Sequence, residues 1–219
     1  NRGPSGYAIG LKDMDDIIIE ENLFLDNRIG AHLDTSPREV DSIGRFTNNV
    51  FAYNDIGVEL QPSVRNNHFQ GNSFVENEEQ VSISGRGTPG KNLWTVNGQG
   101  NYWSDYVGYD ADHNGQGDLA YKSERLFENL MAQEPGLRLF LYSPAVNAID
   151  FAAKAFPFVQ PKPKLIDTLP EMQPVIPEGA PPLQQNNATG WYVVTATVIV
   201  LTLAVAMLPR LGQRGYTFS

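Results

Sequence analysis

The hexad Asn-x-Phe-x-x-Asn occurs three times in the first third of the chain, and this repeat constrains the fold more than any other feature of the sequence. A strand-like run begins two residues after the last Asn of each copy. A repeat of this length, with one small structural unit in each copy, is typical of a solenoid. The copies are Asn22–Asn27, Asn49–Asn54 and Asn72–Asn77, and the runs that follow them are 29–33, 56–60 and 79–83.

Each repeat contains runs of three to five apolar residues, which are too short for a helix. The runs are rich in Ile, Val, Phe and Leu and are separated by Asn, Gly and Asp, a pattern that favours short strands and tight turns. About three such strands in each repeat describe one coil of a parallel β-helix, with neighbouring coils about 4.8 Å apart. The sequence therefore predicts an all-β fold, a parallel β-helix (solenoid).

The repeated residues have predicted positions in such a coil. Phe24, Phe51 and Phe74 should stack in an inward file that fills the core. Asparagine adopts the left-handed conformation at a bend and can hydrogen-bond the nearby backbone. We therefore expect an amide ladder along one corner, formed by one of two sets of residues. The sets are Asn22, Asn49 and Asn72, or Asn27, Asn54 and Asn77.

The composition excludes several classes of function. The chain of 219 residues has a formal net charge of −9, a pI near 4.8 and no cluster of Lys and Arg, so we expect no nucleic-acid partner. It contains no cysteine, which excludes disulfides, thiolate zinc sites and cysteine nucleophiles. Cysteine content alone does not fix the compartment.

An uncharged segment near the end of the chain predicts a membrane anchor. Residues 191–208 are apolar enough for a transmembrane helix, which at 1.5 Å per residue spans about 27 Å. Trp191 and Tyr192 stand where interfacial aromatic residues belong, and Arg210 and Arg214 follow the segment. The positive-inside rule then places the tail in the cytoplasm and the preceding domain outside the membrane. The alternative is a buried core helix.

The chain begins inside the repeat pattern, so we expect it to be the C-terminal part of a longer solenoid. Frequent prolines between residues 157 and 187 favour an extended linker without a core of its own. The predicted parts are β-helix coils over 1–120, a helical or irregular capping and docking segment over 121–158, a Pro-rich linker over 159–190, one transmembrane helix over 191–208 and a cytoplasmic tail over 209–219.

An acidic loop that follows the repeats is similar to the front half of a calcium loop. Oxygen-bearing side chains on alternate residues, with Gly115 at the sixth position, can converge on one cation of the size of Ca²⁺. The bidentate Glu expected at the twelfth position is absent, because that position is Tyr121. The alternative is a metal-free turn that caps the solenoid. The predicted calcium-binding residues are Asp110, Asp112, Asn114, Gln116 and Asp118.

A helix is predicted after Ser143. Ser143 stands at the N-cap, Pro144 at the first helical position, and Pro157 ends the helix. Four apolar residues spaced three or four apart place one stripe on this helix. The stripe either covers the open end of the β-helix or docks onto a membrane partner. The predicted docking residues are Val146, Ile149, Ala153 and Phe156.

Two segments carry a resemblance to known families. The block Gly-Asn-Tyr-Trp-Ser-Asp-Tyr at Gly100–Tyr106 resembles many secreted β-helix proteins that bind or cleave carbohydrates. The run Leu139–Pro157, followed by Gln-Pro-Lys-Pro-Lys at Gln160–Lys164, resembles more narrowly the C-terminal region of the NosD family, periplasmic maturation proteins of nitrous oxide reductase. This resemblance covers roughly residues 6–170.

The NosD resemblance implies a right-handed parallel β-helix that acts as an accessory factor and is not an enzyme. The implied partners are an ABC transporter made of an ATPase and a permease, a copper chaperone, and nitrous oxide reductase, whose copper–sulfur cluster is assembled. Residues 123–170 would contact the permease. With the predicted anchor, the protein would lie on the periplasmic or extracellular face of the cytoplasmic membrane, with copper as a cargo.

The resemblance assigns no copper ligands. Imidazole and thioether groups suit Cu(I), but no histidine or methionine of the chain shows ligand spacing, so the copper site is unknown. His32 should point outward in its strand, in line with Glu59 and Ser82. The residues considered are His32, His68, His113, Met14, Met131, Met172 and Met207.

Two other functions remain open from the sequence. A secreted carbohydrate-binding or carbohydrate-cleaving β-helix protein is the main alternative, and cleavage would need clustered carboxylates in a groove. Glu59, Glu76, Glu78 and Glu79 are predicted to occupy outward positions. A purely structural surface protein without partner chemistry is the other.

Overall fold

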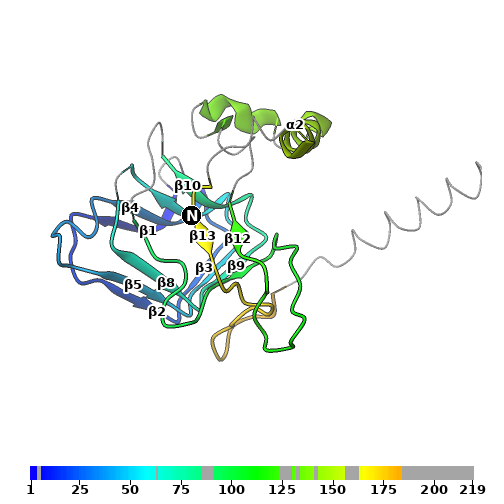
Figure 1. Cartoon of the computed structure of the whole chain (residues 1–219). Helices are drawn as coiled ribbons and strands as arrows, with labels where there is room; N and C mark the ends of the chain where they lie inside the picture. The colour runs from blue at the N-terminus through cyan, green and yellow to red at the C-terminus, as the bar shows by residue number, and fades with distance from the viewer. Residues whose placement is uncertain are drawn as a thin grey trace, which may run out of the picture. The chain divides into compact units, whose positions relative to one another are not determined.

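The computed structural model describes most of the first 183 residues, and their secondary structure consists mainly of short strands (Figure 1). The described residues are 1–3, 6–62, 64–84, 91–123, 130–131, 134–140, 143–155 and 163–183. Residues 1–180 form one compact unit, and residues 181–219 form a second unit, of which only 181–183 are described.

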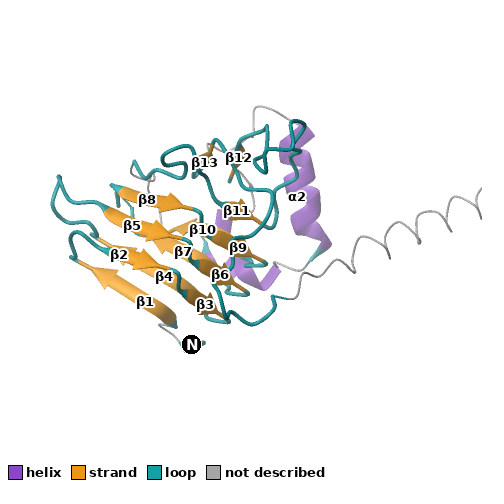
Figure 2. Ribbon diagram, turned by 90° about the horizontal axis from the view of Figure 1, so that it is seen from below, coloured by secondary structure: helices purple, strands orange, loops and turns teal. Residues whose placement is uncertain are grey.

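The strands stack in three parallel faces, which confirms the parallel β-helix (Figure 2). Each strand pairs in parallel with the strand of the same face in the next coil, so equivalent residues of successive repeats lie side by side. The first face consists of β1 (Tyr7–Lys12), β4 (Ile29–Asp34), β7 (Ile56–Leu60) and β10 (Glu79–Ile83). The second consists of β3 (Leu23–Leu25), β6 (Val50–Ala52), β9 (Ser73–Val75) and β11 (Tyr102–Trp103). The third consists of β2 (Ile18–Glu20), β5 (Gly44–Thr47) and β8 (Asn67–Gln70).

Files of stacked aromatic rings fill the core. Phe24, Phe51 and Phe74 lie in register, with neighbouring ring centroids 4.9 and 5.1 Å apart, which confirms the predicted inward file. The file continues through Trp103 and Tyr121, with each centroid 4.3 Å from the ring before it. Stacked pairs of this kind contribute about 0.5–1.5 kcal/mol each beyond the burial of their area. A second, unpredicted file consists of Phe46, Phe69 and Trp94.

Both sets of repeated asparagines form amide ladders, where the sequence predicted one or the other. In each step the backbone N–H and the side-chain Nδ2 of one Asn donate to Oδ1 of the Asn in the next coil. The two bonds measure 3.0 and 3.2 Å from Asn22 to Asn49, and 3.0 Å each from Asn49 to Asn72. The second ladder joins Asn27, Asn54 and Asn77 in the same way.

The ladder asparagines do not adopt the left-handed conformation, so that part of the prediction is wrong. The residue immediately before the ladder residue has positive φ instead, with values of 55° at Glu21, 58° at Tyr53 and 48° at Glu76. The sharp bend one residue earlier leaves both donors of the asparagine aimed at the next coil. Gly71 holds the same place with φ 63°, and a Cβ there would lie 2.4 Å from Asn48 Oδ1.

A segment from far along the chain covers the last coil. Ile166–Asp167 forms β13, which pairs antiparallel with β12 (Tyr121–Lys122). Asp167 is fully buried, and its Oδ2 accepts hydrogen bonds from Asn101 N, Asn101 Nδ2 and Trp103 Nε1 at 2.7, 3.2 and 3.0 Å. Asn101 accepts from Asn72 in turn, so Asp167 is the terminal acceptor of the first asparagine ladder.

A buried ion pair lies at the same end of the β-helix. Glu79 was predicted to point outward, but it is in register with Ile56 on the inward face of β10 and is only 1% exposed. Lys164 Nζ lies 2.5 Å from Glu79 Oε1, and its side chain is 4% exposed. Leu165, next to it in the chain, belongs to the hydrophobic core. The last coil is therefore closed by apolar and charged groups together.

The segments predicted after the coils need one correction. Residues 164–172 of the linker predicted over 159–190 pack on the last coil. Their charged side chains bind residues of the β-helix there, which composition does not reveal. The segment predicted over 121–158 includes the 3₁₀ helix η1 (Pro135–Phe140) and the helix α2 (Pro144–Ala155). Helix α2 begins after Ser143, as predicted, although Ser143 Oγ makes no hydrogen bond with a described residue.

The predicted membrane anchor is not described. Among the described segments, no helix has the combination of length and apolar character that crossing a membrane requires. Residues 191–208 and the tail 209–219 lie outside the described residues, so the anchor and its orientation stay predictions.

Candidate functional site

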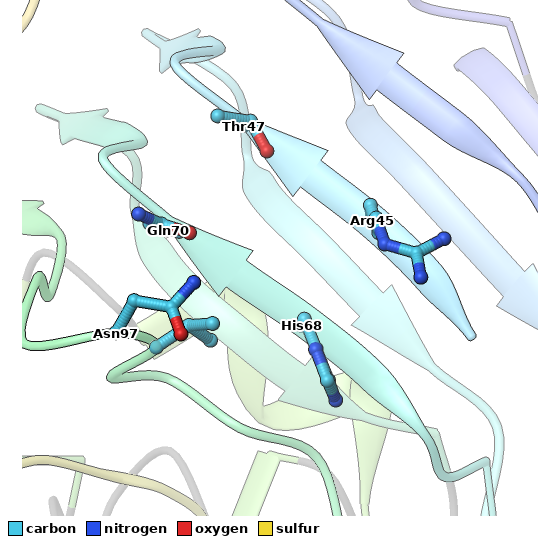
Figure 3. Close-up of a pocket in the computed structure, with 6 residues that line it drawn as sticks. Arg45, Thr47, His68, Gln70 and Asn97 are labelled. Carbon is cyan, nitrogen blue, oxygen red and sulfur yellow. The ribbon is translucent and has the colours of Figure 1, made fainter.

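A polar pocket lies on the outer face of the sheet formed by β2, β5 and β8 (Figure 3). Arg45 and Thr47 project from β5, and His68 and Gln70 project from the same face of β8. Because the two strands are in register, Arg45 lies beside His68 and Thr47 lies beside Gln70. The cavity has a volume of about 140 Å³, and its other lining residues are Val96 and Asn97.

Strand alternation explains why these side chains face outward. The phenylalanine between the two polar residues of each strand is fully buried, so its neighbours point to the other face. Ile18 pairs with Arg45 on one side, and Leu93 forms a bridge with His68 on the other. Both apolar side chains are exposed, so they flank the pocket. This site was not predicted from the sequence, although the polar–Phe–polar triplets of β5 and β8 carried the signal.

Burial and charge set the protonation state of the pocket. Burial lowers the pKa of His68, and the positive charge of Arg45 lowers it further, so the imidazole is neutral at pH 7. The side chain of Arg45 forms no ion pair or hydrogen bond with any residue that the structure describes. Gln70 Nε2 donates to Gln99 Oε1 at 3.0 Å. The pocket therefore offers a cation and neutral polar groups, with no acid among its lining residues.

A second polar cluster lies on the outer face of β1, β4 and β7. His32 Nδ1 lies 2.7 Å from Glu59 Oε2, and the two residues are in register, followed by Ser82 as predicted. The Tyr7 ring stacks on the imidazole of His32 at a centroid distance of 4.5 Å. Gly10 stands opposite His32 in β1, and a Cβ at this position would lie in ordinary contact with the Tyr7 ring, at 3.4 Å. The cluster holds His32 in one orientation.

The first half of the predicted calcium loop forms one turn. Asp110 accepts hydrogen bonds from the backbone N–H groups of Asn114 and Gly115 at 3.1 and 2.9 Å, and Asp112 accepts one from Asn114 Nδ2 at 2.9 Å. Desolvation acts to raise the pKa of Asp110, but the hydrogen bonds outweigh it and lower that pKa below its ordinary value. Gly115 has φ 87°, which suits the sharp turn at the sixth position of a calcium loop.

The second half of the loop has other partners. Gln116 Nε2 donates to Gly98 O at 2.9 Å, and Asp118 accepts from the Ala111 N–H at 2.8 Å. Within the described segments, His, Asp and Glu side chains do not gather in threes in a way that would hold a metal ion. The calcium site therefore stays a prediction.

Helix α2 shows only part of the predicted docking stripe. Val146 and Ile149 are partly exposed, the side chain of Ala153 is not described, and Phe156 lies outside the described residues. Phe151, which was not predicted, is 74% exposed on the same helix. The docking surface stays a proposal.

The residues considered for copper lie on separate elements. His32 belongs to β4, His68 to β8, and His113 to the acidic loop. Met131 is buried and Met14 is exposed. Met172 is partly exposed, and Met207 lies outside the described residues. Among the described residues, these side chains do not form a set of copper ligands.

Comparison with known proteins gives one family. The model of the family described as "Periplasmic copper-binding protein (NosD)" matches residues 1–108. A "Probable ABC transporter binding protein NosD" of Stutzerimonas stutzeri is 35% identical over 126 residues, which is 58% of this chain and 28% of that protein. A protein of the same description from Pseudomonas aeruginosa is 35% identical over 130 residues, 59% of this chain and 29% of its own length. The matched part thus spans less than a third of either relative.

Proposed function

The chain belongs to the NosD family through residues 1–108, and on this premise we propose that it is a periplasmic accessory protein of an ABC transporter, with no catalytic activity of its own. We place its role in the assembly of the copper–sulfur cluster of nitrous oxide reductase, with copper as cargo. The observation that carries the proposal is the 35% identity to two proteins described as probable ABC transporter binding proteins.

The β-helix supports a binding role over carbohydrate cleavage. Stacked aromatic rings and asparagines fill its interior, so the outer faces are left for partners. Glu79 is buried with Lys164, and Glu59 bonds His32, so two of the four acids considered for cleavage are already engaged. Cleavage needs two carboxyl groups that flank the scissile bond. The engagement of Glu59 and Glu79 leaves neither of them to flank a scissile bond, and this favours the accessory role.

The proposed partners are the permease and ATPase of the transporter, the copper chaperone and nitrous oxide reductase. We assign permease contact to the stripe on α2, because a helix with partly exposed apolar residues offers a surface of its own. The anchor predicted at 191–208 would hold this surface near the membrane. The stripe consists of Val146, Ile149, Ala153 and Phe156.

Deletion of the gene tests the proposed function. The strain without it should produce nitrous oxide reductase that lacks its copper–sulfur cluster, and a copy of the intact gene should restore the cluster. Copper analysis and the absorption spectrum of the purified reductase measure this. A normal cluster content in the deletion strain would contradict the proposal, whereas glycan cleavage by the purified protein would revive the alternative.

Co-purification tests the docking stripe. A tagged full-length chain should recover the permease and ATPase from solubilised membranes. Ile149→Asp should reduce this recovery, and Ala148→Asp, which adds the same charge at an exposed position of α2, should not. If both variants recover equal amounts of permease and ATPase, the stripe is not part of the interface with the transporter.

We also propose Ca²⁺ as a ligand of the turn that begins at Asp110. A ligand that binds only the folded chain raises its melting temperature. Millimolar Ca²⁺ should therefore raise the melting temperature of the intact chain, and Asp110→Asn should abolish the increase. An unchanged melting temperature of the intact chain would assign the loop to the metal-free turn.

A further inference from the structure

We propose that the pocket between Arg45 and His68 binds a carboxylate group, supplied by a small organic acid or by an acidic side chain of a partner protein. The pocket lies on the outer face of β2, β5 and β8, to which the family match assigns no role. The inference does not depend on the proposed role in cluster assembly.

The positive charge of Arg45 is not paired with an acid among the described residues. Acids outnumber bases in this chain, 25 Asp and Glu against 16 Lys and Arg, and Arg2, Lys12 and Arg38 each pair with a neighbouring acid. Arg45 makes no such pair with a described residue. Its guanidinium offers five N–H donors in a planar fork, a geometry that matches the two oxygens of a carboxylate.

Neutral polar groups lie around that charge. Thr47, His68 and Asn97 line the cavity, and their side chains make no hydrogen bonds with described residues. The neutral imidazole and the hydroxyl each carry one donor, and the amide carries two. A carboxylate accepts several hydrogen bonds, so these groups complement it together with the guanidinium.

The pocket is small and is flanked by apolar side chains. A cavity of about 140 Å³ has room for a carboxyl group on a short aliphatic stem. Ile18 and Leu93, exposed at 61% and 48%, lie on either side of the Arg45–His68 row and can cover that stem. Glu20 lies in register with Thr47 but does not line the pocket. Its negative charge at the edge of the pocket repels an anion that binds there.

Nuclear magnetic resonance of the full-length chain with labelled histidine tests the proposal. The chain has three histidines, so the ring signals of His68 can be assigned with a His68→Gln variant. The two probes are succinate, for a free acid, and N-acetylglutamate amide, for a protein side chain. We expect a saturable shift of the His68 signals, while those of His32 and His113 stay in place.

Three variants locate the binding energy. Arg45→Gln should weaken binding about tenfold or more, because it removes a charge-assisted hydrogen bond. Arg65→Gln removes the same charge from an exposed position outside the pocket and should leave binding unchanged. Glu20→Gln should strengthen binding. Circular dichroism checks that each variant keeps its fold.

The outcomes separate the two sources of the carboxylate. Binding of succinate alone assigns the pocket to a free acid, binding of the glutamate probe alone assigns it to a partner's side chain, and binding of both supports the shared chemistry. The proposal fails if neither probe shifts the His68 signals. It also fails if neutral N-acetylglutamine amide binds as well, or if Arg45→Gln binds like the original chain.

Discussion

Single asparagines determine how the coils stack. Asn72 is fully buried, and its Oδ1 accepts from the backbone N–H and from Nδ2 of Asn49. Its own Nδ2 donates to Phe46 O and to Asn101 Oδ1 at 2.8 and 2.9 Å. A buried polar side chain with this many partners costs little only while all of them are present. The position of each asparagine in the ladder therefore determines how much it contributes to the free energy of unfolding.

Replacing Asn72 should destabilise the chain far more than replacing Asn22. Asn72→Ala leaves buried donors and acceptors of two coils unpaired, so we expect a loss of about 3–5 kcal/mol in the free energy of unfolding. Asn22 is exposed at the start of the same ladder, and Asn22→Ala should cost about 1 kcal/mol or less. Denaturant unfolding of both variants measures the difference. Equal losses would show that the ladder does not stabilise the stack.

His68 should make the fold sensitive to acid. Burial and then Arg45 hold its pKa below the ordinary value of 6.5, so the unfolded chain binds a proton at higher pH than the folded chain does. His68 therefore reduces stability below about pH 6.5, and the reduction disappears as the pH rises above that value. Arg45 is the charged group among the lining residues, since Thr47, Gln70, Val96 and Asn97 are uncharged.

Unfolding at about pH 7 and about pH 5 checks this expectation. His68→Gln should lose less stability between the two pH values than the original chain does. Arg45→Gln should recover part of the effect, because desolvation, the larger cause, remains. His113→Gln changes an exposed histidine and serves as the control. A loss that is identical with and without His68 would contradict the assignment.

At the scale of elements, the segment Lys164–Met172 completes the last coil. It adds β13 to β12 and supplies Asp167 to the ladder and Lys164 to Glu79. The bonds of Asp167 to Asn101 and of Lys164 to Glu79 join residues more than sixty positions apart in the sequence. The segment thus behaves as part of the β-helix, although its composition is that of a linker.

The Glu79–Lys164 pair should show strong coupling. Lys164→Met removes the ammonium group that lies beside the buried carboxylate of Glu79, so we expect a loss of about 3–5 kcal/mol in the free energy of unfolding. Adding Glu79→Gln to Lys164→Met should recover most of that loss, because the buried negative charge is then removed as well. A double-mutant cycle by urea unfolding measures the coupling. Additive losses would mean that the two charges stabilise the fold independently.

At the scale of the whole molecule, sequence reasoning succeeded where the chain repeats. The hexad predicted the β-helix and the file of Phe24, Phe51 and Phe74, because the same side chain meets itself in every coil. The prediction of an outward position for Glu79 was wrong. Its inward position depends on Lys164, which lies outside the repeats. The pocket at Arg45 was missed because its residues lie between hexads. The family match spans 1–108, whereas the resemblance rested on 139–164.

The predicted anchor governs where the whole chain resides. The intact chain should sediment with membranes and resist extraction by high salt, because 191–208 is uncharged and long enough to span a bilayer. Removing residues 184–219 should release it into the soluble fraction. Release by salt alone would indicate peripheral attachment. Recovery of the intact chain in the soluble fraction would contradict the predicted membrane anchor.

The first asparagine ladder, from Asn22 to Asn101, has a direction along its length. Each amide from Asn22 to Asn101 donates toward the C-terminal coil, so the side-chain dipoles add in one direction, with their positive end at the last coil. The carboxylate of Asp167 lies at that end, where a negative charge is favoured, as it is at the N-terminus of a helix. A carboxylate has no N–H to pass on, so it also stops the series. Asp167 therefore ends this ladder at its C-terminal side, where no donor remains for the asparagine of a further coil.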